Sequence, residues 1–449
     1  MNRRTFFQSV AVSAAAGARA SAPSDRIGVA IVGCGGMGRM NLTDFQKQPD
    51  VEIVAVCDVW EANARRALEL AGGRAEVYKD YRRVLERRDV DAVVVATPDH
   101  WHPLITIEAC QAGKDVYVEK PVSHNVREGR LMVEAARRYG RVVQVGLQQR
   151  SGSHFQRAVR AVQQGRIGTV HFAQCWNHSH GPAEGIGTPP DGEPPEGLDW
   201  DFWLGPAPKV PFNPARLRFH WFWDYAGGQL TNWGVHLLDV VHWALGVDAP
   251  LSAASSGGRL WTRDARQCPD TQEALFEYPG CLVRYTTLAH NSYGPNGDPG
   301  ARPFGSYGIL LHGTLGTLLV DRAGYEIIPQ SEQHAEPFSQ SFREAYDDLS
   351  GVGLYYKAKT QAERGTTSLQ HLPHVRNFLD CLKSRARPAA DIEIGHRATT
   401  ACHLGNIAFR TGEKILWDAW AERITNSEEA NRLLARPYRP PWKLKGLEG

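Results

Sequence analysis

Short apolar runs alternate with amphipathic stretches along the first third of the chain. Mostly apolar residues, in runs suited to strands buried on both faces, occupy residues 27–32, 51–57, 91–96, 115–118 and 142–145. Between them, apolar residues recur at helical spacing in residues 40–45, 103–112 and 128–138. Strands that alternate with helices predict an α/β fold with a doubly wound parallel sheet over residues 25–150.

A different pattern begins near residue 168. Strand-like runs follow at residues 170–176, 272–278, 282–288, 308–312 and 315–320, and helical patterns return at 372–383 and 396–409. Long insertions rich in Pro and Gly separate them at about 181–198, 291–306 and 329–368. We therefore expect an α+β domain with a large open, mostly antiparallel sheet over residues 151–420. Its last helices pack back on the first domain, and residues 421–449 form a tail.

The first 22 residues look like a targeting segment. Arg3 and Arg4 precede an aromatic pair, residues 10–18 are alanine-rich, and Ala18-Arg19-Ala20 has the small-x-small form of a cleavage site. The segment resembles a twin-arginine export signal, which predicts a periplasmic or extracytoplasmic location. A frayed basic N-terminus is the alternative. These residues are left out of the predicted fold.

Composition narrows the classes of partner. The 449 residues include 51 Lys and Arg and 49 Asp and Glu, a balance that suggests neither nucleic acid nor an anionic membrane surface. Beyond the N-terminus no apolar run approaches the length of a membrane span. The eight cysteines are scattered without metal spacing, and we expect most to be free, buried small hydrophobic residues.

A glycine-rich turn links the first predicted strand to the first predicted helix. Its residues are Gly33, Cys34, Gly35, Gly36, Met37 and Gly38. In such a fingerprint Gly33 permits the tight turn, Gly35 lets the backbone approach a pyrophosphate, and Gly38 allows close packing of helix on strand. The free amides at the helix start favour phosphate. Strand, turn and helix together predict a dinucleotide-binding Rossmann domain.

Asp58 ends the second predicted strand, about 20 residues beyond Gly38, where a carboxylate binds the hydroxyls of the adenosine ribose. Val59 and Trp60 follow it, so no arginine next to it in the sequence would pair with a 2′-phosphate. We expect NAD as the cofactor and NADP as less suitable.

Two further motifs lie where predicted strands end. Thr97, Pro98 and His102 belong to one motif, and His102 either contacts the cofactor or only caps the next helix. Glu119 and Lys120 stand before Pro121 in the other. A doubly wound sheet presents groups to ligands at this edge, and a lysine in a cleft needs a negative partner or a reacting oxygen. We expect Thr97, Pro98, Glu119 and Lys120 at the cofactor.

A second cluster follows a Gly-Gly pair in the second domain. Asn232, His236 and Asp239 are four and three residues apart, so on a helix they would share one face, with Trp233 beside them. A histidine there could move a hydroxyl proton with a pKa near the working pH. Taken alone, a helix histidine is as easily a packing residue.

In this order, the glycine turn, Glu119-Lys120-Pro121 and Gly234-Val235-His236 resemble the Gfo/Idh/MocA oxidoreductases, a family that includes glucose-fructose oxidoreductase and inositol dehydrogenase. The resemblance spans roughly residues 27–420. It implies that Lys120 contacts the reacting sugar hydroxyl near the nicotinamide and that His236 is the acid/base at the same carbon. The family often has aspartate where this chain has Asn232, so Lys120 and His236 must carry the proton transfer.

Other candidates are weaker. His178 and His180 alternate after a strand, but no third ligand has suitable spacing and the resembling family generally needs no metal, so we expect none. His178, Asp239 and Trp233 are candidate substrate contacts. Five tryptophans, at positions 200, 203, 221, 223 and 233, could stack on sugar faces, although at least half are expected in the core.

The sequence therefore predicts an NAD-dependent oxidoreductase acting on a secondary hydroxyl of a sugar, polyol or glycoside, with a retained cofactor. One alternative is a glycoside hydrolase or lyase that recycles NAD through oxidation and elimination. Another is a sugar-binding protein with a relic nucleotide site. The open sheet of the second domain suggests a homo-oligomer.

Overall fold

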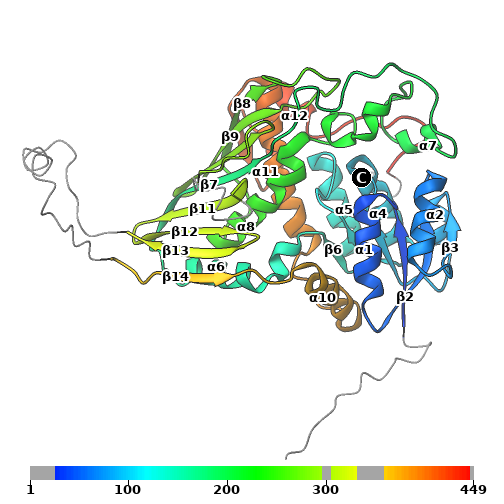
Figure 1. Ribbon diagram of the computed structural model, residues 1–449, viewed down its shortest axis with the longest axis horizontal. Helices are drawn as coiled ribbons and strands as arrows, with labels where there is room; N and C mark the ends of the chain where they lie inside the picture. The colour runs from blue at the N-terminus through cyan, green and yellow to red at the C-terminus, as the bar shows by residue number, and fades with distance from the viewer. Residues whose placement is uncertain (1–25, 296–304, 331–357, 445–449) are drawn as a thin grey trace, which may run out of the picture.

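The computed structural model describes residues 26–295, 305–330 and 358–444, and the expected export signal lies outside these ranges. Two sheets organise the described chain (Figure 1). A parallel sheet with helices around it forms the first domain, and a larger mixed sheet lies at the far end of the second. The predicted fold class is confirmed.

The first sheet has six strands in the order β3-β2-β1-β4-β5-β6, and every neighbouring pair is parallel. The strands are β1 (Ile27–Val32), β2 (Val51–Cys57), β3 (Glu76–Tyr78), β4 (Ala92–Val95), β5 (Asp115–Val118) and β6 (Val143–Val145). Every residue of β1, β4 and β5 is buried, as expected for parallel strands covered on both faces. The strand order reverses between β1 and β4, where such sheets bind ligands at their carboxyl ends.

Helices cover both faces of this sheet. They are α1 (Gly36–Gln46), α2 (Glu61–Leu70), α3 (Tyr81–Leu85), α4 (His102–Gln111) and α5 (Val126–Arg138), with a 3₁₀ turn, η2 (Asp99–Trp101), before α4. Asn125 caps α5 by accepting a hydrogen bond of 3.0 Å from the Glu128 amide. The predicted helices are present with ends shifted by a few residues.

The second sheet has ten strands in the order β14-β13-β12-β11-β7-β10-β9-β8-β15-β16, mostly antiparallel except for the parallel pair β7 and β10. Five of them match the predicted strands: β7 (Val170–His178), β9 (Thr271–Tyr278), β10 (Cys281–Leu288), β11 (Tyr307–Gly313) and β12 (Gly316–Asp321). The others are β8 (Ser252–Gly258), β13 (Gly324–Pro329), β14 (Glu363–Thr366), β15 (Ile415–Asp418) and β16 (Arg423–Ile424). Small polar residues and glycines in β8, and the short length of the edge strands, weaken the sequence signal.

The remaining helices join the two sheets. They are α6 (Ser153–Gln163), α7 (Trp200–Leu204), α8 (Val235–Leu245), α10 (His371–Ser384), α11 (Ile392–Thr411) and α12 (Glu428–Arg432), with short turns η3 (Gln148–Ser151), η4 (Pro214–Leu217), η5 (Phe219–Trp221) and η6 (Leu230–Gly234). Helix α11 contacts both α5 of the first domain and β8 of the second. In Figure 1 it lies between the large sheet and the first domain. One hydrophobic cluster therefore runs through both domains, from Val93 in β4 to Phe276 in β9.

Helix α10 returns to the first domain from near the end of the chain. Its Phe378 meets Phe45 of α1 and Tyr117 of β5 with ring centroids 6.1 and 5.8 Å apart, both edge to face. All three rings are fully or almost fully buried. The contact fixes the second domain against the first at the back of the parallel sheet.

Buried side chains between Leu198 and Tyr225, with Cys268, form a separate hydrophobic cluster, and we call residues 198–225 the aromatic cover. Trp200 and Trp203 stack at 4.7 Å, and Tyr225 packs on Trp203 at 5.0 Å. Trp200, Trp203 and Trp221 are buried, in line with the expectation that at least half of the five tryptophans belong to the core.

The segment expected to be a tail ties this cover to the first domain. Arg436 donates to Glu128 of α5 at 2.9 Å, to the His100 carbonyl at 3.0 Å and to the Asp224 carbonyl at 3.2 Å. Arg439 donates to Asp201 of the cover at 2.7 Å. Residues 423–444 are therefore structured and connect elements that are distant in the sequence.

All eight cysteines are free and buried, as predicted. Across the described ranges, every helix is too short or too polar to cross a membrane.

Candidate active site

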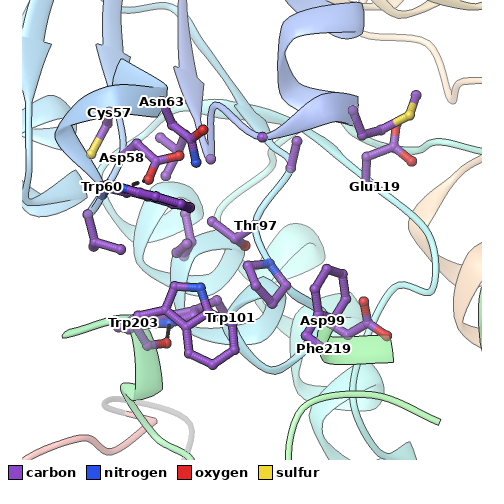
Figure 2. Close-up of a pocket in the computed structure, with 18 of the residues that line it drawn as sticks. Cys57, Asp58, Trp60, Asn63, Thr97, Asp99, Trp101, Glu119, Trp203 and Phe219 are labelled. Carbon is purple, nitrogen blue, oxygen red and sulfur yellow. Dashed lines mark hydrogen bonds between the residues drawn. The ribbon is translucent and has the colours of Figure 1, made fainter. Parts of the chain in front are cut away.

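A cavity of about 480 Å³ opens at the carboxyl ends of β1, β2, β4 and β5. The first domain lines one wall, and the aromatic cover supplies Phe202, Trp203, Leu217 and Phe219 to the other. Figure 2 shows Trp203 and Phe219 facing Asp58, Trp60 and Thr97 across this space. The cavity therefore lies between the domains, where enclosed ligand sites are common.

The glycine turn forms the floor of the cavity. Gly33 has φ of +86°, a conformation that favours glycine, and a side chain there would meet the backbone of Ala96 at 2.6 Å. A Cβ on Gly38 would lie 1.8 Å from the Gly33 carbonyl oxygen. Helix α1 can approach the turn this closely only because Gly38 has no side chain.

The same turn leaves space for a phosphate group. A Cβ on Gly35 or Gly36 would meet nothing within 4 Å, and both residues line the cavity with Met37. Helix α1 starts here without a side-chain cap and without an acidic residue in its first turn. Its free amides and open backbone surface thus fit the pyrophosphate of a dinucleotide.

Asp58 lines the cavity beside the glycine turn. Its carboxylate accepts hydrogen bonds from the Cys34 amide at 2.7 Å and from the Trp60 amide at 2.8 Å. Burial raises the pKa of Asp58, while the Trp60 and Cys34 amides oppose that rise. Cys34 itself turns its thiol toward the strand backbone and is fully buried. Asp58 is therefore fixed in position to accept bonds from ribose hydroxyls.

Two cations near Asp58 were not apparent from the residues that follow it. Arg39 donates to the Cys34 carbonyl at 2.7 Å, and Lys79 lines the cavity while paired with Asp199 at 2.8 Å. Arg39 lies in α1 and Lys79 follows β3, so neither cation could be predicted from the residues next to Asp58 in the sequence. Their present partners are a carbonyl and a carboxylate of the protein.

Thr97 and Pro98 line the cavity, whereas His102 holds the loops behind it. The two ring nitrogens of His102 lie 2.8 Å from the Pro121 carbonyl and 2.9 Å from the Thr97 carbonyl. Burial lowers the pKa of His102 to about 4. A neutral ring therefore joins the two motifs at the strand ends, and His102 is not among the residues that line the cavity.

Glu119 is buried at the end of β5 and also lines the cavity. Its carboxylate accepts from Asn41 at 3.0 Å, from Gln148 at 3.4 Å and from the Lys120 amide at 3.3 Å. Burial raises the pKa of Glu119, an effect that nearby Lys120 opposes. These three donors hold the carboxylate and so position the backbone of Lys120.

Lys120 and Asn232 meet in the cavity, although they are 112 residues apart. The Lys120 ammonium donates to the Asn232 side-chain oxygen at 2.9 Å and to its main-chain carbonyl at 3.0 Å. Burial lowers the pKa of Lys120; Glu119 and Asp99 oppose this change and Arg322 adds to it. The lysine is thus held by two neutral oxygens in surroundings that favour its uncharged form.

Asp99 is a cavity residue that the sequence analysis did not single out. It stands two positions after Thr97 in the same motif and is 5% exposed. Burial raises the pKa of Asp99 to about 7, with Lys120 acting in the opposite direction. Its place at the carboxyl end of a buried strand was the signal available in the sequence. A carboxyl group with this pKa can exchange protons at neutral pH.

The structure corrects the expectation for His236. Burial, followed by Arg322 and Lys120, lowers the pKa of His236 well below its usual value, not near the working pH. The ring is 4% exposed, and its Nδ1 has no hydrogen-bond partner among the described residues. His236 is therefore a neutral group behind the cavity wall.

The expected single helical face is also corrected. Asn232 lies in the π-helical turn η6, whereas His236 and Asp239 lie in α8, so the α-helical spacing does not apply across them. Asp239 is 1% exposed and paired with Arg150 at 2.8 Å. This pairing directs its carboxylate to Arg150, and Asp239 does not line the cavity.

The other two proposed substrate contacts lie apart from the cavity lining. Trp233 packs edge to face on Tyr307 at 5.5 Å. His178 is buried in β7 against the Tyr293 carbonyl, and burial lowers its pKa. Within the described ranges, no three His, Cys, Asp or Glu side chains are grouped to hold a metal ion.

Comparison with known proteins matches both domains to one family. The profile described as "Oxidoreductase family, NAD-binding Rossmann fold" covers residues 27–147, and that of the "C-terminal alpha/beta domain" of the same family covers residues 185–256 and 350–444. The chain belongs to the Gfo/Idh/MocA family. The matched ranges together make up more than half of the chain.

Relatives within this family are named dehydrogenases and oxidoreductases. Inositol 2-dehydrogenase of Klebsiella pneumoniae is 32% identical over 160 residues, which are 35% of this chain and 48% of that protein. Inositol 2-dehydrogenase of Rubrobacter xylanophilus is 34% identical over 158 residues, 35% of this chain and 45% of that protein. The chain thus spans less than half the length of these curated relatives.

Solved structures share the fold over most of the chain. The WlbA dehydrogenase from Bordetella pertussis, in complex with NADH and UDP-GlcNAcA, has a TM-score of 0.62 at 21% identity. The alignment covers 88% of this chain and 99% of that one. At this identity the comparison establishes the architecture of both domains.

Proposed function

We propose that this protein is an NAD-dependent oxidoreductase that transfers a hydride between a secondary hydroxyl of a sugar, polyol or glycoside and a nicotinamide cofactor. The observation that carries the proposal is Lys120, held by Asn232 in the cavity that the glycine turn and Asp58 also line. Family membership and the named inositol dehydrogenases support the class of reaction.

Different residues of the cavity would bind different parts of the cofactor. Gly35, Gly36 and the start of α1 would hold the pyrophosphate, and Asp58 the adenosine ribose. When bound, the nicotinamide supplies the hydride acceptor. Trp203 and Phe219 of the aromatic cover would exclude water from the reacting end of the cavity, by which we mean the part where Lys120 meets Asn232.

Lys120 is the proposed proton acceptor. Its uncharged form is favoured by burial, and its nitrogen is fixed by the two oxygens of Asn232. Among the described residues the Asn232 amide N–H groups have no hydrogen-bond acceptor, so they are available to a substrate oxygen. Lys120 then takes the hydroxyl proton as the C–H hydride leaves.

Asp99 is the proposed second proton carrier. It lines the same cavity as Lys120 and is close enough to affect the lysine pKa. With a pKa of about 7, Asp99 can take up the proton that Lys120 must lose before the next turnover. Asp99 would thus supply the titratable carboxyl group that the amide side chain of Asn232 does not have.

The test compares Lys120→Met with Lys414→Met, a matched change at an exposed lysine just before β15. NAD reduction is followed by nicotinamide absorbance with a panel of sugars, polyols and glycosides. We expect the first variant to lose about a thousandfold or more in turnover while still binding NAD, and the second to match the wild type. Equal turnover in all three proteins would contradict the role of Lys120. Sugar binding without turnover in the wild type would favour the relic-site alternative.

A redox-neutral glycosidase or lyase is the second candidate, because the aromatic cover favours a retained cofactor. The cover is tied down by Arg436 and Arg439 over the cavity. In this reaction the substrate carbon is oxidised, the neighbouring C–H loses its proton, the aglycone leaves, and the hydride returns after water adds. Release of aglycone without net NADH would support it. Full retention of deuterium at the carbon that must lose its proton would exclude it.

Location and assembly are further parts of the proposal. The N-terminal segment supports twin-arginine export, and signal cleavage in the periplasmic fraction would test it.

The outer face of the second sheet exposes Leu275, Leu282 and Ile328 at 38, 38 and 46%, which supports pairing with a second copy. Light scattering of the purified protein distinguishes a monomer from this homo-oligomer.

A further inference from the structure

Arg322 stands on the turn between β12 and β13, outside the group of residues predicted to act. Its guanidinium lies over two aromatic rings, 5.1 Å from the centre of Trp233 and 5.3 Å from that of Tyr307. Trp233 directly follows Asn232, the residue that holds Lys120. The two rings restrict the guanidinium, which also donates a hydrogen bond to the Tyr307 hydroxyl, while its Nε has no hydrogen-bond partner.

The described part of the chain supplies no carboxylate partner for Arg322. No ion pair forms there between its guanidinium and an acidic side chain, and its Nε is buried without a hydrogen bond. By contrast, Arg150 and Arg266, two arginines that are more deeply buried than the partly buried Arg322, are paired with Asp239 and Asp264 at 2.8 and 2.9 Å. A buried guanidinium nitrogen without an acceptor is uncommon and invites a ligand.

Arg322 acts on the reacting end of the cavity. It is among the groups that lower the pKa of both Lys120 and His236. Two acidic groups lie nearby, but Glu119 is held by Asn41 and Gln148, and the carboxyl of Asp99 is half protonated near neutral pH. Arg322 therefore places a positive charge beside Trp233 and Tyr307.

We propose that Arg322 binds an anionic group on the substrate, so that the substrate class is a sugar bearing a carboxylate or a phosphate. This inference rests on the proposed function, because it places the anion on the molecule whose hydroxyl meets Lys120. The planar guanidinium offers paired N–H donors that match two oxygens of either anion. Trp233 and Tyr307 hold the plane in place.

The test uses glucose, glucuronate and glucose 6-phosphate, with galactose and galacturonate as a second series. Each is titrated by calorimetry into NADH-loaded protein, and each is assayed for NAD reduction. The variants are Arg322→Met, which keeps the apolar stem, and Arg322→Lys, which keeps the charge. We expect one or both anionic sugars to bind about 10- to 100-fold more tightly than the neutral sugar. The preference should fall to about unity in Arg322→Met and partly survive in Arg322→Lys.

The outcomes separate the two proposals. Equal affinity for neutral and anionic sugars in the wild type, or none for any, overturns the anionic substrate class. A preference that persists in Arg322→Met overturns the role of Arg322, provided that the variant keeps its melting temperature and bound NADH. If anionic sugars bind preferentially but none of them changes the redox state of NAD, the oxidoreductase function fails and the anion site stands. Comparison of glucuronate with glucose 6-phosphate identifies the anion.

Discussion

The side-chain nitrogen of Lys120 binds Asn232 twice, through the amide oxygen at 2.9 Å and the main-chain carbonyl at 3.0 Å. The first residue lies two positions after strand β5 of the parallel sheet, and the second lies in a π-helical turn of the other domain. Both partners of the lysine are uncharged oxygens. This contact joins the two domains within the cavity, and the carboxylates of Glu119 and Asp99 act on the lysine ammonium only through their charge.

Asn232→Asp is expected to move the pH dependence of turnover to higher pH. A carboxylate beside Lys120 favours the ammonium and raises the lysine pKa, so less of the uncharged base is present at neutral pH. A shift of about one to three pH units is expected, with turnover at pH 7 reduced about tenfold or more. The measurement is the pH profile of kcat.

Asn232→Ser is the control for this variant, because it shortens the side chain that contacts Lys120 without adding a charge. Its activity should fall at all pH values with little displacement of the profile. If the aspartate variant keeps the wild-type profile, then Lys120 is not the group whose ionisation controls the rate.

Asp99→Asn is expected to remove a titration near neutral pH. The pKa of Asp99 is about 7 in the folded protein against 3.8 for an ordinary aspartate. If the ionised carboxylate accepts the proton from Lys120, wild-type turnover rises with pH through about 7, and the variant lacks that rise. The experiment is a pair of kcat profiles between pH 5 and about 9.

The same group makes a prediction for stability. Because folding raises the pKa of Asp99, its stabilising effect is fully present below pH 3.8 and is lost as pH rises through about 7. The free energy of unfolding of Asp99→Asn, measured relative to that of the wild type, should therefore increase between pH 3.8 and about 7. The increase should reach up to about 4 kcal/mol and stay constant at higher pH. A constant difference in melting temperature across this range would show that the buried carboxyl does not titrate as described.

Two glycines in the same turn should respond differently to alanine. Gly38→Ala places a Cβ 1.8 Å from the Gly33 carbonyl, so the helix must move and the protein should lose about 1–3 kcal/mol of stability. Gly36→Ala meets no protein atom within 4 Å but fills space that lines the cavity. It should keep its melting temperature and bind NAD about tenfold more weakly. Thermal unfolding and the NAD content of the purified proteins separate the two effects.

Asp58→Ser is expected to weaken the binding of NAD and to reduce the preference of the protein for NAD over NADP. The carboxylate would repel a 2′-phosphate, while Lys79 and Arg39 lie close enough to attract one once that charge is removed. We expect an affinity for NAD about tenfold lower and a clear rise in the ratio of NADP to NAD affinity. Trp60→Leu, next to the carboxylate, is a control that alters packing and keeps the charge.

The Rossmann domain was predictable because its signals are local. Buried parallel strands require apolar runs, a turn such as that at Gly33 requires a residue tolerant of positive φ, and Asp58 follows its strand directly. Strands such as β8 and β14 were missed because they are short or rich in small and polar residues, and only their neighbours in the sheet determine them.

The site was predictable in position but not in its charges. The sequence by itself determined that Lys120 closely follows a strand, that the glycine turn precedes it and that an asparagine stands at position 232, since these follow from order and periodicity. Only the tertiary structure decided that Asn232 holds Lys120, that burial raises the pKa of Asp99 to about 7, that burial lowers the pKa of His236 and that Arg322 lies over Trp233 and Tyr307. The reason is physical: desolvation and Coulomb interactions depend on distances in space between groups such as Lys120 and Asn232, which are 112 positions apart, and no local pattern in the chain encodes them.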